Sequence, residues 1–351
     1  CRSEFIRDVF DPCPIANEFA PTGGGQFVMK PSLQKSQRGV ALVTALLVVS
    51  LVTVAAVAMA ARQQIDVRRT ANLIHGEQAY AYAVSAESWA RVVLRRDAKD
   101  NDYDAPDDDW ATALPPIAVE GGLVSGRVED QQGRFNLNNL VDDTGKVSEP
   151  DRKYFIRLLE NLGLEQELAD RLIDWMDRDI EVRVPGGAED QEYLLLEPSY
   201  RTANRGLTHI SELRLIKGFE RDAVDLLLPH VTALPVRTPI NVNTATNAVL
   251  LALHPELSGS DVDLLLEDRG DSGYQNLEEF LGHDALAGLQ LEIDLDVSTA
   301  YFRVLTDVQV GQGEARLESL LVRGEEGVQV IYRIRSPLRL VSALPQGDAV
   351  N

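Results

Sequence analysis

The feature that most constrains this chain is an unbroken apolar stretch. Residues 40–61 read VALVTALLVVSLVTVAAVAMAA and contain no charged residue, glycine or proline. A helix of this length rises about 33 Å, which matches the hydrocarbon core of a bilayer. Basic residues flank it on both sides, Lys35 and Arg38 before it and Arg62 and Arg68 after it. The stretch predicts one membrane-spanning helix whose N-terminal side stays cytoplasmic.

A cleaved secretory signal is the alternative interpretation of this stretch. The apolar part of such a signal lasts roughly 7–15 residues and ends in small residues. Here the run is longer, and Met59-Ala60-Ala61 continues into a further helical pattern without a break. We therefore predict an uncleaved membrane helix.

The residues before the helix fall into two parts. Residues 1–28 show no clear periodicity and precede Met29, whereas residues 29–39, MKPSLQKSQRG, form a compact basic leader. We expect translation to begin at Met29. Residues 1–28 would then be a non-functional upstream extension.

The leader and the helix together resemble the N-terminus of type IV prepilin-like proteins. In that class a membrane peptidase cuts after the leader's last glycine and methylates the new amine, so the resemblance implies cleavage between Gly39 and Val40. Most members carry glutamate at the fifth mature position, where this chain has Thr44. That glutamate is thought to neutralise the amine of a neighbouring subunit, so a subunit at the tip, without a predecessor, can dispense with it. An ordinary anchor that happens to follow a glycine is the alternative.

The helical pattern continues beyond the membrane stretch. No proline interrupts residues 40–98, so we predict one long helix with a membrane half and an amphipathic half. The apolar residues of the amphipathic half recur at helical spacing and are expected to form core: Ile65, Ala71, Ile74, Ala79, Ala83, Ala86, Trp89 and Val92.

An acidic segment follows the helix, with seven aspartates within residues 97–109. The spacing Asp100-x-Asp102-x-Asp104 resembles the start of an EF-hand loop, but alanine occupies the places that require glycine and the bidentate glutamate. We interpret the segment as a solvated loop, with weak cation binding as the alternative.

The remaining chain changes from strand to helix patterns and back. Residues 115–137 read as short strands. Residues 150–231 are helical, with hairpins about Gly163 and Gly218, and a further helical block covers residues 245–289. Strands return near the C-terminus, where apolar and polar residues alternate over 302–310. This order predicts an α+β fold, in which a long N-terminal helix packs on an antiparallel sheet and a large helical domain is inserted.

Two asparagine-containing phrases stand where the patterns change. Residues 134–140 read RFNLNNL and residues 239–245 read PINVNTA, and asparagine or threonine there can cap a helix. The phrases resemble those that bracket the helical insertion of the K minor pseudopilins of type II secretion, the GspK family. With the Gly39 junction, Thr44 and the acidic loop, the resemblance covers residues 29–335 and implies a pseudopilin fold.

The resemblance divides the chain into segments. The first part of the pseudopilin domain would hold the amphipathic helix, the acidic loop and the first strands. In chain order the predicted segments are the upstream extension 1–28, the leader 29–39, the transmembrane half of the helix 40–61, the first part of the pseudopilin domain 62–144, the inserted helical domain 145–295, the C-terminal strands 296–337 and the tail 338–351.

The strongest candidate site is a group of carboxylates in the helical insertion. Helical spacing places Asp174 and Asp177 on one face, and a Gly-Gly turn can fold the stretch after residue 187 back toward them. Carboxylates on flexible loops, without cysteine or clustered histidine, favour calcium. In the K pseudopilin family calcium is bound in the helical domain. The resemblance gives four candidate ligands of a structural calcium ion: Asp177, Asp179, Glu189 and Asp190. A solvated acidic loop is the alternative.

The charge balance argues against nucleic-acid binding. The chain has 55 Asp+Glu against 34 Lys+Arg, a net charge of −21, and phosphate binding depends on Lys and Arg. The phrase 239–245 and the helices after it also resemble helix-hairpin-helix DNA-binding modules. However, the equivalent turn has one glycine and two acids, and residues 218–351 contain no lysine. We expect no nucleic-acid partner.

No enzyme motif is found. The five histidines are dispersed, and neither a nucleophile motif nor a phosphate-binding loop occurs. Aromatic residues make up only 6% of the chain, so the paired carboxylates lack the platform that a glycosidase needs.

The resemblance implies a structural function. The chain would be a minor pseudopilin at the tip of the type II secretion pseudopilus, anchored in the inner membrane with its globular part in the periplasm, and would assist export across the outer membrane. The implied partners are the I and J minor pseudopilins, the prepilin peptidase and, at the tip, the secretin or an exoprotein. The alternatives are an unrelated single-pass periplasmic binding protein and a DNA-binding protein of the competence type.

Overall fold

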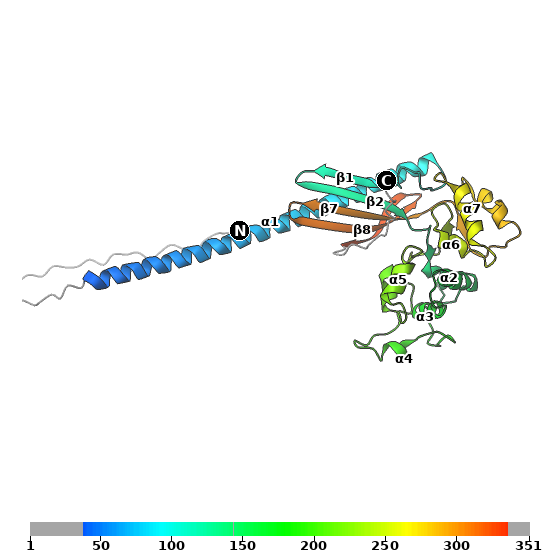
Figure 1. Ribbon diagram of the computed structural model, residues 1–351, viewed down its shortest axis with the longest axis horizontal. Coiled ribbons are helices and arrows are strands. Elements are labelled where there is room, and N and C mark those ends of the chain that lie inside the picture. Colours follow the sequence, from blue (N-terminus) through cyan, green and yellow to red (C-terminus); the bar gives the residue numbers. More distant parts are fainter. Residues whose placement is uncertain (1–37, 143, 336–351) are drawn as a thin grey trace, which may run out of the picture. The chain divides into compact units, whose positions relative to one another are not determined.

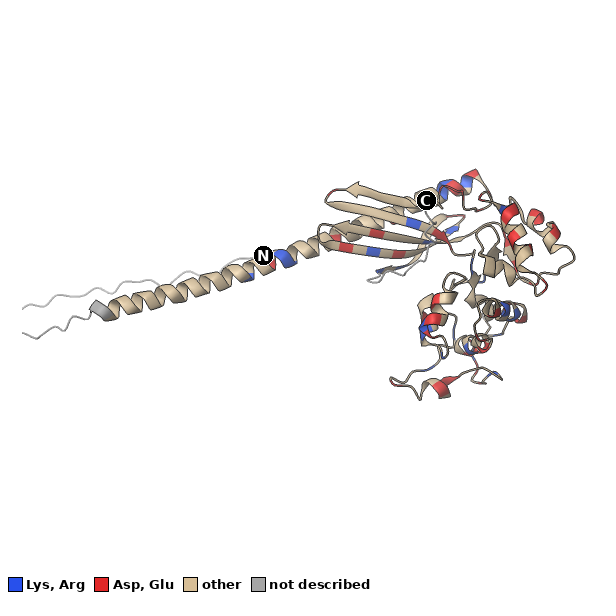
Figure 2. Ribbon diagram, viewed as in Figure 1, with Lys and Arg blue, Asp and Glu red and all other residues tan. Residues whose placement is uncertain are grey.

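The computed structural model describes residues 38–142 and 144–335 and divides into two compact units, Cys1–Gln64 and Ile65–Asn351. The described part of the first unit is the beginning of helix α1 (Arg38–Asp100) (Figure 1). Among the described residues, α1 alone is long and apolar enough to cross a membrane. In Figure 2 the ribbon of its first part is a long stretch without the colours of charged residues. The single long helix predicted from the sequence is confirmed.

Three predicted segments lie largely outside the described residues. These are the upstream extension 1–28, the leader 29–39 except for its last two residues, and the tail 338–351. Gly39 is described only as part of the backbone of α1.

The second unit is built on a five-stranded antiparallel sheet with the order β1-β2-β7-β8-β9. Its strands are β1 (Leu114–Val119), β2 (Gly122–Asp130), β7 (Tyr301–Val310), β8 (Gly313–Gly324) and β9 (Gly327–Arg335). The alternation predicted over 302–310 is confirmed, since the even-numbered residues of β7 are buried. Those side chains join cores that also contain residues of α1.

The part of α1 in this unit packs through small side chains. Ala79, Ala83 and Ala90 are buried together with Leu94, and alanines let the helix lie close to the strands. Glu87 is buried on the same face. Its carboxylate accepts hydrogen bonds from Ser319 (2.6 Å) and from the guanidinium group of Arg333 (2.7 and 2.9 Å), which compensates the buried charge.

The predicted core stripe of α1 is wrong at four positions. The large side chains of Ile65, Ile74, Trp89 and Val92 are exposed, and the buried face is made by alanines, Leu94 and Glu87 instead. Ala79 and Ala83 are buried as predicted, and from there the buried stripe continues through Glu87, Ala90 and Leu94. A substantial apolar face of α1 is left uncovered by the residues that the structure describes.

The chain leaves the sheet after β2 and returns at β7, where Asp130 faces Phe302. Residues 131–300 build a helical insertion with its own large core. Its α-helices are α2 (Glu149–Asn161), α3 (Glu167–Met176), α4 (Asp190–Tyr193), α5 (Arg221–Leu227), α6 (Asn247–Leu251), α7 (Gly259–Arg269) and α8 (Leu277–Leu281). Its 3₁₀ helices are η1 (Leu137–Leu140), η2 (Ile210–Leu215) and η3 (Asp284–Leu286). Two short parallel pairs join β3 (Phe135–Asn136) to β4 (Val231–Thr232) and β5 (Ile240–Asn241) to β6 (Leu295–Asp296).

The helical hairpin about Gly163 is confirmed, because α2 and α3 flank this glycine, which has a φ of +70°. The second hairpin differs from the prediction. Its first element is the 3₁₀ helix η2 and not an α-helix. The helix begins after a capping box at His209 and ends at Ile216, whose backbone is extended. Only Leu213 of this short element is buried, so it lacks the apolar face that would extend an α-helix.

Of the two asparagine-containing phrases, the second links the insertion to the sheet. The side chain of Asn136 accepts a hydrogen bond from the backbone N–H of Asn138 and caps η1, as predicted. Asn241 has a different function, because its buried amide donates to the carbonyl of Asp104 (3.2 Å) and the carboxylate of Asp130 (2.9 Å). Thr246 caps α6 instead.

Candidate metal centre

The first part of the candidate site lies at the C-terminal end of α3. This helix buries Leu172, Ile173 and Met176, which turns Asp174 and Asp177 inward as well. Asp177 is the C-cap residue, and its backbone N–H still donates to the carbonyl of Ile173 (2.8 Å). The helix therefore fixes the position of the Asp177 carboxylate, which is 1% exposed.

The second part comes from the N-cap residue of α4, Glu189, whose side chain is 2% exposed. One carboxylate oxygen each of Asp177, Asp179 and Glu189 lies within 4.8 Å of the others. Neither oxygen of Glu189 has a hydrogen-bond partner in the described part of the chain. A buried carboxylate without a donor is destabilising unless a cation or a proton compensates it.

Asp174 adds a fourth carboxylate to this group. It is fully buried and accepts a hydrogen bond from the backbone N–H of Arg183 (3.1 Å). It also forms an ion pair with the guanidinium group of Arg183 (3.4 Å). Arg183 also contacts Asp177 at 3.3 Å. The helical spacing of Asp174 and Asp177 is visible in the sequence, but Asp174 is not among the four ligands that the family resemblance implies.

The electrostatics of the group favour binding of a cation. Burial, together with the charges of Asp174 and Asp177, raises the pKa of Glu189 to about 7. Burial also raises the pKa of Asp174 to about 6, and that of Asp177 is raised by burial and by Asp179. Arg183 compensates only part of this negative charge. The residues present thus fit a divalent cation with hard oxygen ligands.

The fourth predicted ligand, Asp190, has other partners. Its Oδ1 accepts hydrogen bonds from the backbone N–H (3.0 Å) and the hydroxyl (2.9 Å) of Thr202, and its Oδ2 pairs with Arg201 (3.2 Å). The structure therefore brings three of the four candidates together. Asp190 ties the loop after α4 to the site.

Thr44 lies in the described part of the first unit. Its hydroxyl donates to the carbonyl oxygens of Val40 (3.1 Å) and Ala41 (3.0 Å) in its own helix. The position predicted to be the fifth of the mature chain therefore carries no charge, and its hydroxyl group is already hydrogen-bonded.

The predicted solvated loop is wrong at three aspartates. Asp97 and Asp104 are buried and Asp108 is half-buried, because Arg323 of β8 pairs with Asp97 (2.8 Å) and with Asp104. A partner so distant in the sequence gives no signal in the acidic segment itself.

The fold and these features define a class of protein. A long apolar helix that continues as the packed spine of an antiparallel sheet is the architecture of a pilin-like subunit, and the helical insertion between β2 and β7 distinguishes this one within the class. The family described as "Type II secretion system (T2SS), protein K" matches residues 133–236 and 240–299, which lie within the insertion.

Relatives match over most of the chain. The type II secretion system protein K of Pseudomonas aeruginosa is 40% identical over 314 residues, which cover 86% of this chain and 93% of the relative. The corresponding proteins of Klebsiella pneumoniae and Aeromonas hydrophila are 37% and 35% identical and are covered over 96% and 98% of their lengths. The chain belongs to the type II secretion system protein K family and is a minor pseudopilin of that system.

A solved structure supports the same assignment. The GspK-GspI-GspJ complex from the type 2 secretion system of enterotoxigenic Escherichia coli contains a chain that matches with a TM-score of 0.69 and 28% identity. The match covers 77% of this chain and all of the other. The predicted combination of long helix, antiparallel sheet and inserted helical region is therefore confirmed.

Proposed function

We propose that this minor pseudopilin stands at the tip of the pseudopilus, where it initiates the fibre and assists protein export across the outer membrane. The observation that carries the proposal is Thr44, whose hydroxyl is bonded into its own helix and leaves no carboxylate to receive the amine of a preceding subunit. The apolar helix would anchor the chain in the inner membrane, and the second unit would lie in the periplasm. We assign it a structural and not a catalytic function.

The tip position can be tested by placing at residue 44 the glutamate that most related pilin-like subunits carry there. Thr44→Glu would place a carboxylate at the fifth mature position, and Thr44→Gln is the matched neutral control. For a subunit without a predecessor, we expect the acid to bring no gain in fibre assembly and the neutral control to behave like the natural chain. Improved assembly of the Thr44→Glu chain alone would contradict the tip position. Fibre length by electron microscopy and exoprotein secretion measure the result.

The exposed apolar face of α1 supports assembly with other pseudopilins. Trp89 is 49% exposed and Val92 60% exposed, on the side of α1 turned away from the sheet core. The related GspK was solved together with GspI and GspJ. We assign this face of α1 to contacts with the I and J minor pseudopilins, while the insertion remains free to contact the secretin or an exoprotein.

Trp89→Asp is expected to weaken the complex with the I and J subunits by more than about 2 kcal/mol, since exposed tryptophans at interfaces are frequent hot spots. Co-purification from detergent extracts at graded concentrations measures the effect. Val236→Asp, which also replaces an exposed apolar residue but lies in the insertion, should leave the complex intact. Equal loss in both variants would contradict the assignment of α1.

Processing of the leader gives an independent test. Co-expression with a prepilin peptidase is expected to remove the chain up to Gly39 and to add one methyl group to the new amine of Val40. Intact mass spectrometry of the purified chain, with and without the peptidase, measures both changes. An unchanged mass with an intact leader would defeat the pseudopilin processing and favour an ordinary membrane anchor.

We also propose that the insertion holds a structural calcium ion. Asp177, Asp179 and Glu189 would bind it, with Asp174 beside them and Asp190 tying the loop after α4 to the site. Support comes from the two unpartnered oxygens of buried Glu189 and from the oxygen-only donor set. The ion would supply positive charge that joins two loops, and it would take no part in chemistry.

A further inference from the structure

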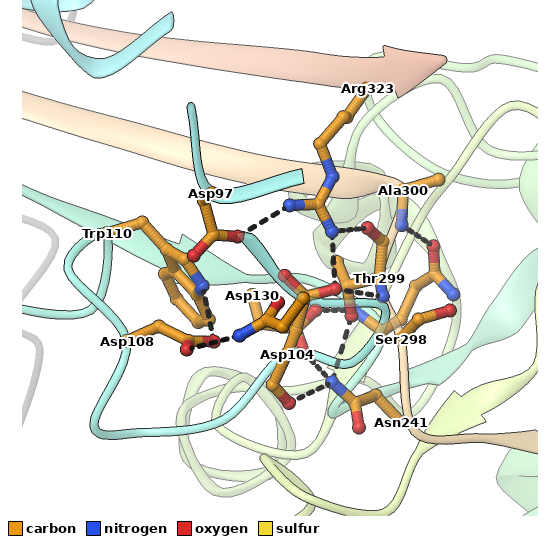
Figure 3. A network of polar contacts seen from close by, with 12 residues as sticks. Asp97, Asp104, Asp108, Trp110, Asp130, Asn241, Ser298, Thr299, Ala300 and Arg323 are labelled. Carbon is orange, nitrogen blue, oxygen red and sulfur yellow. Dashed lines mark hydrogen bonds and ion pairs between the residues drawn. The ribbon is translucent and has the colours of Figure 1, made fainter. Parts of the chain in front are cut away.

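A second group of carboxylates lies outside the insertion, where α1 ends. Asp97 belongs to the last turns of α1, and Asp104 and Asp108 lie in the loop that follows. One oxygen of each of these three carboxylates lies within 4.8 Å of the others. Figure 3 shows the three side chains beside Trp110 and Arg323.

Arg323 compensates only part of this negative charge. Its guanidinium group donates to Asp97 (2.8 Å), to Asp104 and to the carbonyl of Thr299 (2.8 Å). The buried carboxylate of Asp130 adjoins the same network through the amide of Asn241 (2.9 Å). Arg323 thus pairs with two of these four carboxylates, Asp97 and Asp104, and burial raises the pKa of Asp104 to about 7.

The hydrogen-bond donors are all on one side of Asp104. Its Oδ2 accepts from Arg323 and from the backbone N–H of Thr299 (2.6 Å). Asp104 is 0% exposed, so water does not reach its Oδ1, and this oxygen has no hydrogen-bond donor among the described residues. The Oδ1 of Asn101 is likewise buried without a partner. Asp104 belongs to the carboxylate group, and Asn101 is bonded to Asp108 of that group, so each unsatisfied acceptor oxygen belongs to a residue of this loop and would be satisfied by a cation.

The remaining donors in this loop hold Asp108 in place. Its Oδ2 accepts from the backbone N–H of Ala105 (2.8 Å) and from Nε1 of Trp110 (3.1 Å). Its Oδ1 accepts from the amide of Asn101 (3.2 Å). The carboxylate is therefore positioned by the fold and not by a neighbouring positive charge, which is the state of a preorganised ligand.

We propose that Asp97, Asp104 and Asp108 bind a divalent cation of the calcium type, with Oδ1 of Asn101 as a further oxygen ligand. Aspartate and amide oxygens are the donors that calcium prefers, and no soft ligand is present among these residues. The ion would close the loop onto the end of α1. Through Arg323 and Asn241 it would also steady β8 and the point where the insertion joins the sheet.

Trp110 allows this site to be tested by itself. Its ring nitrogen is bonded to Asp108, so a terbium ion bound at the site would lie close to an indole that can sensitise its luminescence. The chain has three tryptophans. Trp89→Phe with Trp175→Phe leaves Trp110 as the only tryptophan. Excitation at the red edge of tryptophan absorption, where tyrosine does not absorb, then leaves the site in the insertion, which lies beside Trp175 and Tyr193, without a sensitiser. Terbium is titrated into this full chain in detergent micelles after treatment with a chelator.

We expect saturable, tryptophan-sensitised terbium luminescence that calcium displaces. Asp108→Asn in the same background should weaken the terbium affinity by at least about tenfold, because ligand charge sets the affinity of such sites. Asparagine keeps an acceptor oxygen for Ala105 and Trp110, so the loop should stay folded, which circular dichroism checks. The matched control is Asp107→Asn, an exposed neighbour outside the group, which should leave the affinity unchanged.

Three results would overturn the proposal. The first is luminescence no greater than that of a control chain that also carries Trp110→Phe. This control removes the sensitiser and leaves all the proposed ligands intact. The second is luminescence that calcium does not displace. The third is an equal loss of affinity in the Asp108→Asn and Asp107→Asn chains, which would indicate diffuse attraction to an acidic surface.

Discussion

Arg323→Ala is expected to lower the free energy of unfolding by about 3–5 kcal/mol when chelator is present. Arg323 is the shared partner of Asp97 and Asp104, both buried, and its guanidinium group also lies 4.8 Å from the centre of the Phe302 ring. Its removal would leave two carboxylates buried near each other. Denaturant unfolding of the full chain in detergent micelles, followed by fluorescence, measures the change.

Arg316 provides a control on the same strand. It pairs with Asp307 at 2.5 Å and with Glu314 at 3.8 Å, but both acids are largely exposed. Arg316→Ala should therefore change the stability by less than about 1 kcal/mol. Similar losses for the two variants would mean that burial of Asp97 and Asp104 does not determine the stability of this joint.

Calcium is expected to stabilise the insertion by about 2.7 kcal/mol at a hundred times its dissociation constant, provided that it binds only the folded chain. Asp177→Ala should remove the tightest binding event seen by titration calorimetry. Glu189→Gln should do the same, because it replaces the buried carboxylate that lacks a donor. Thermal unfolding with calcium and with chelator then measures the linked stability.

Two nearby acids distinguish ligands from neighbours. Glu192 pairs with Lys217 (2.6 Å) at the surface, so Glu192→Gln should leave the calcium isotherm unchanged. Asp190→Asn tests the fourth predicted ligand, and its bonds to Thr202 lead us to expect altered stability with the same number of bound ions. An unaltered isotherm for Asp177→Ala would place the calcium elsewhere.

Much of the fold could be predicted because its determinants are local. An apolar run without glycine or proline specifies α1, and strict alternation specifies β7. The face that α1 buries could not be predicted in the same way. Its alanines and Glu87 are buried because strands from the other end of the chain lie against them, whereas the larger Trp89 and Val92 remain outside.

The two groups of carboxylates differ in the same way, because one is specified by local sequence signals and the other by partners distant in the sequence. The sequence predicted carboxylates around Asp177, since helix spacing and a glycine turn are local signals, and Glu189 does lie beside them. The group at Asp104 was interpreted as solvated because its environment depends on Arg323, Thr299 and Asn241. These partners approach only after the sheet and the insertion have come together.

The pairing of β2 with β7 has a consequence for how the protein is made and how it can vary. It closes a loop that contains residues 131–300. The entropy of closing a loop grows only with the logarithm of its length, so doubling the loop costs about 0.6 kcal/mol. Insertions of very different size can thus occupy this position with little effect on the sheet. During synthesis, however, β2 has no second neighbour until the ribosome has passed the whole insertion, so the sheet is the last part of the protein to be completed.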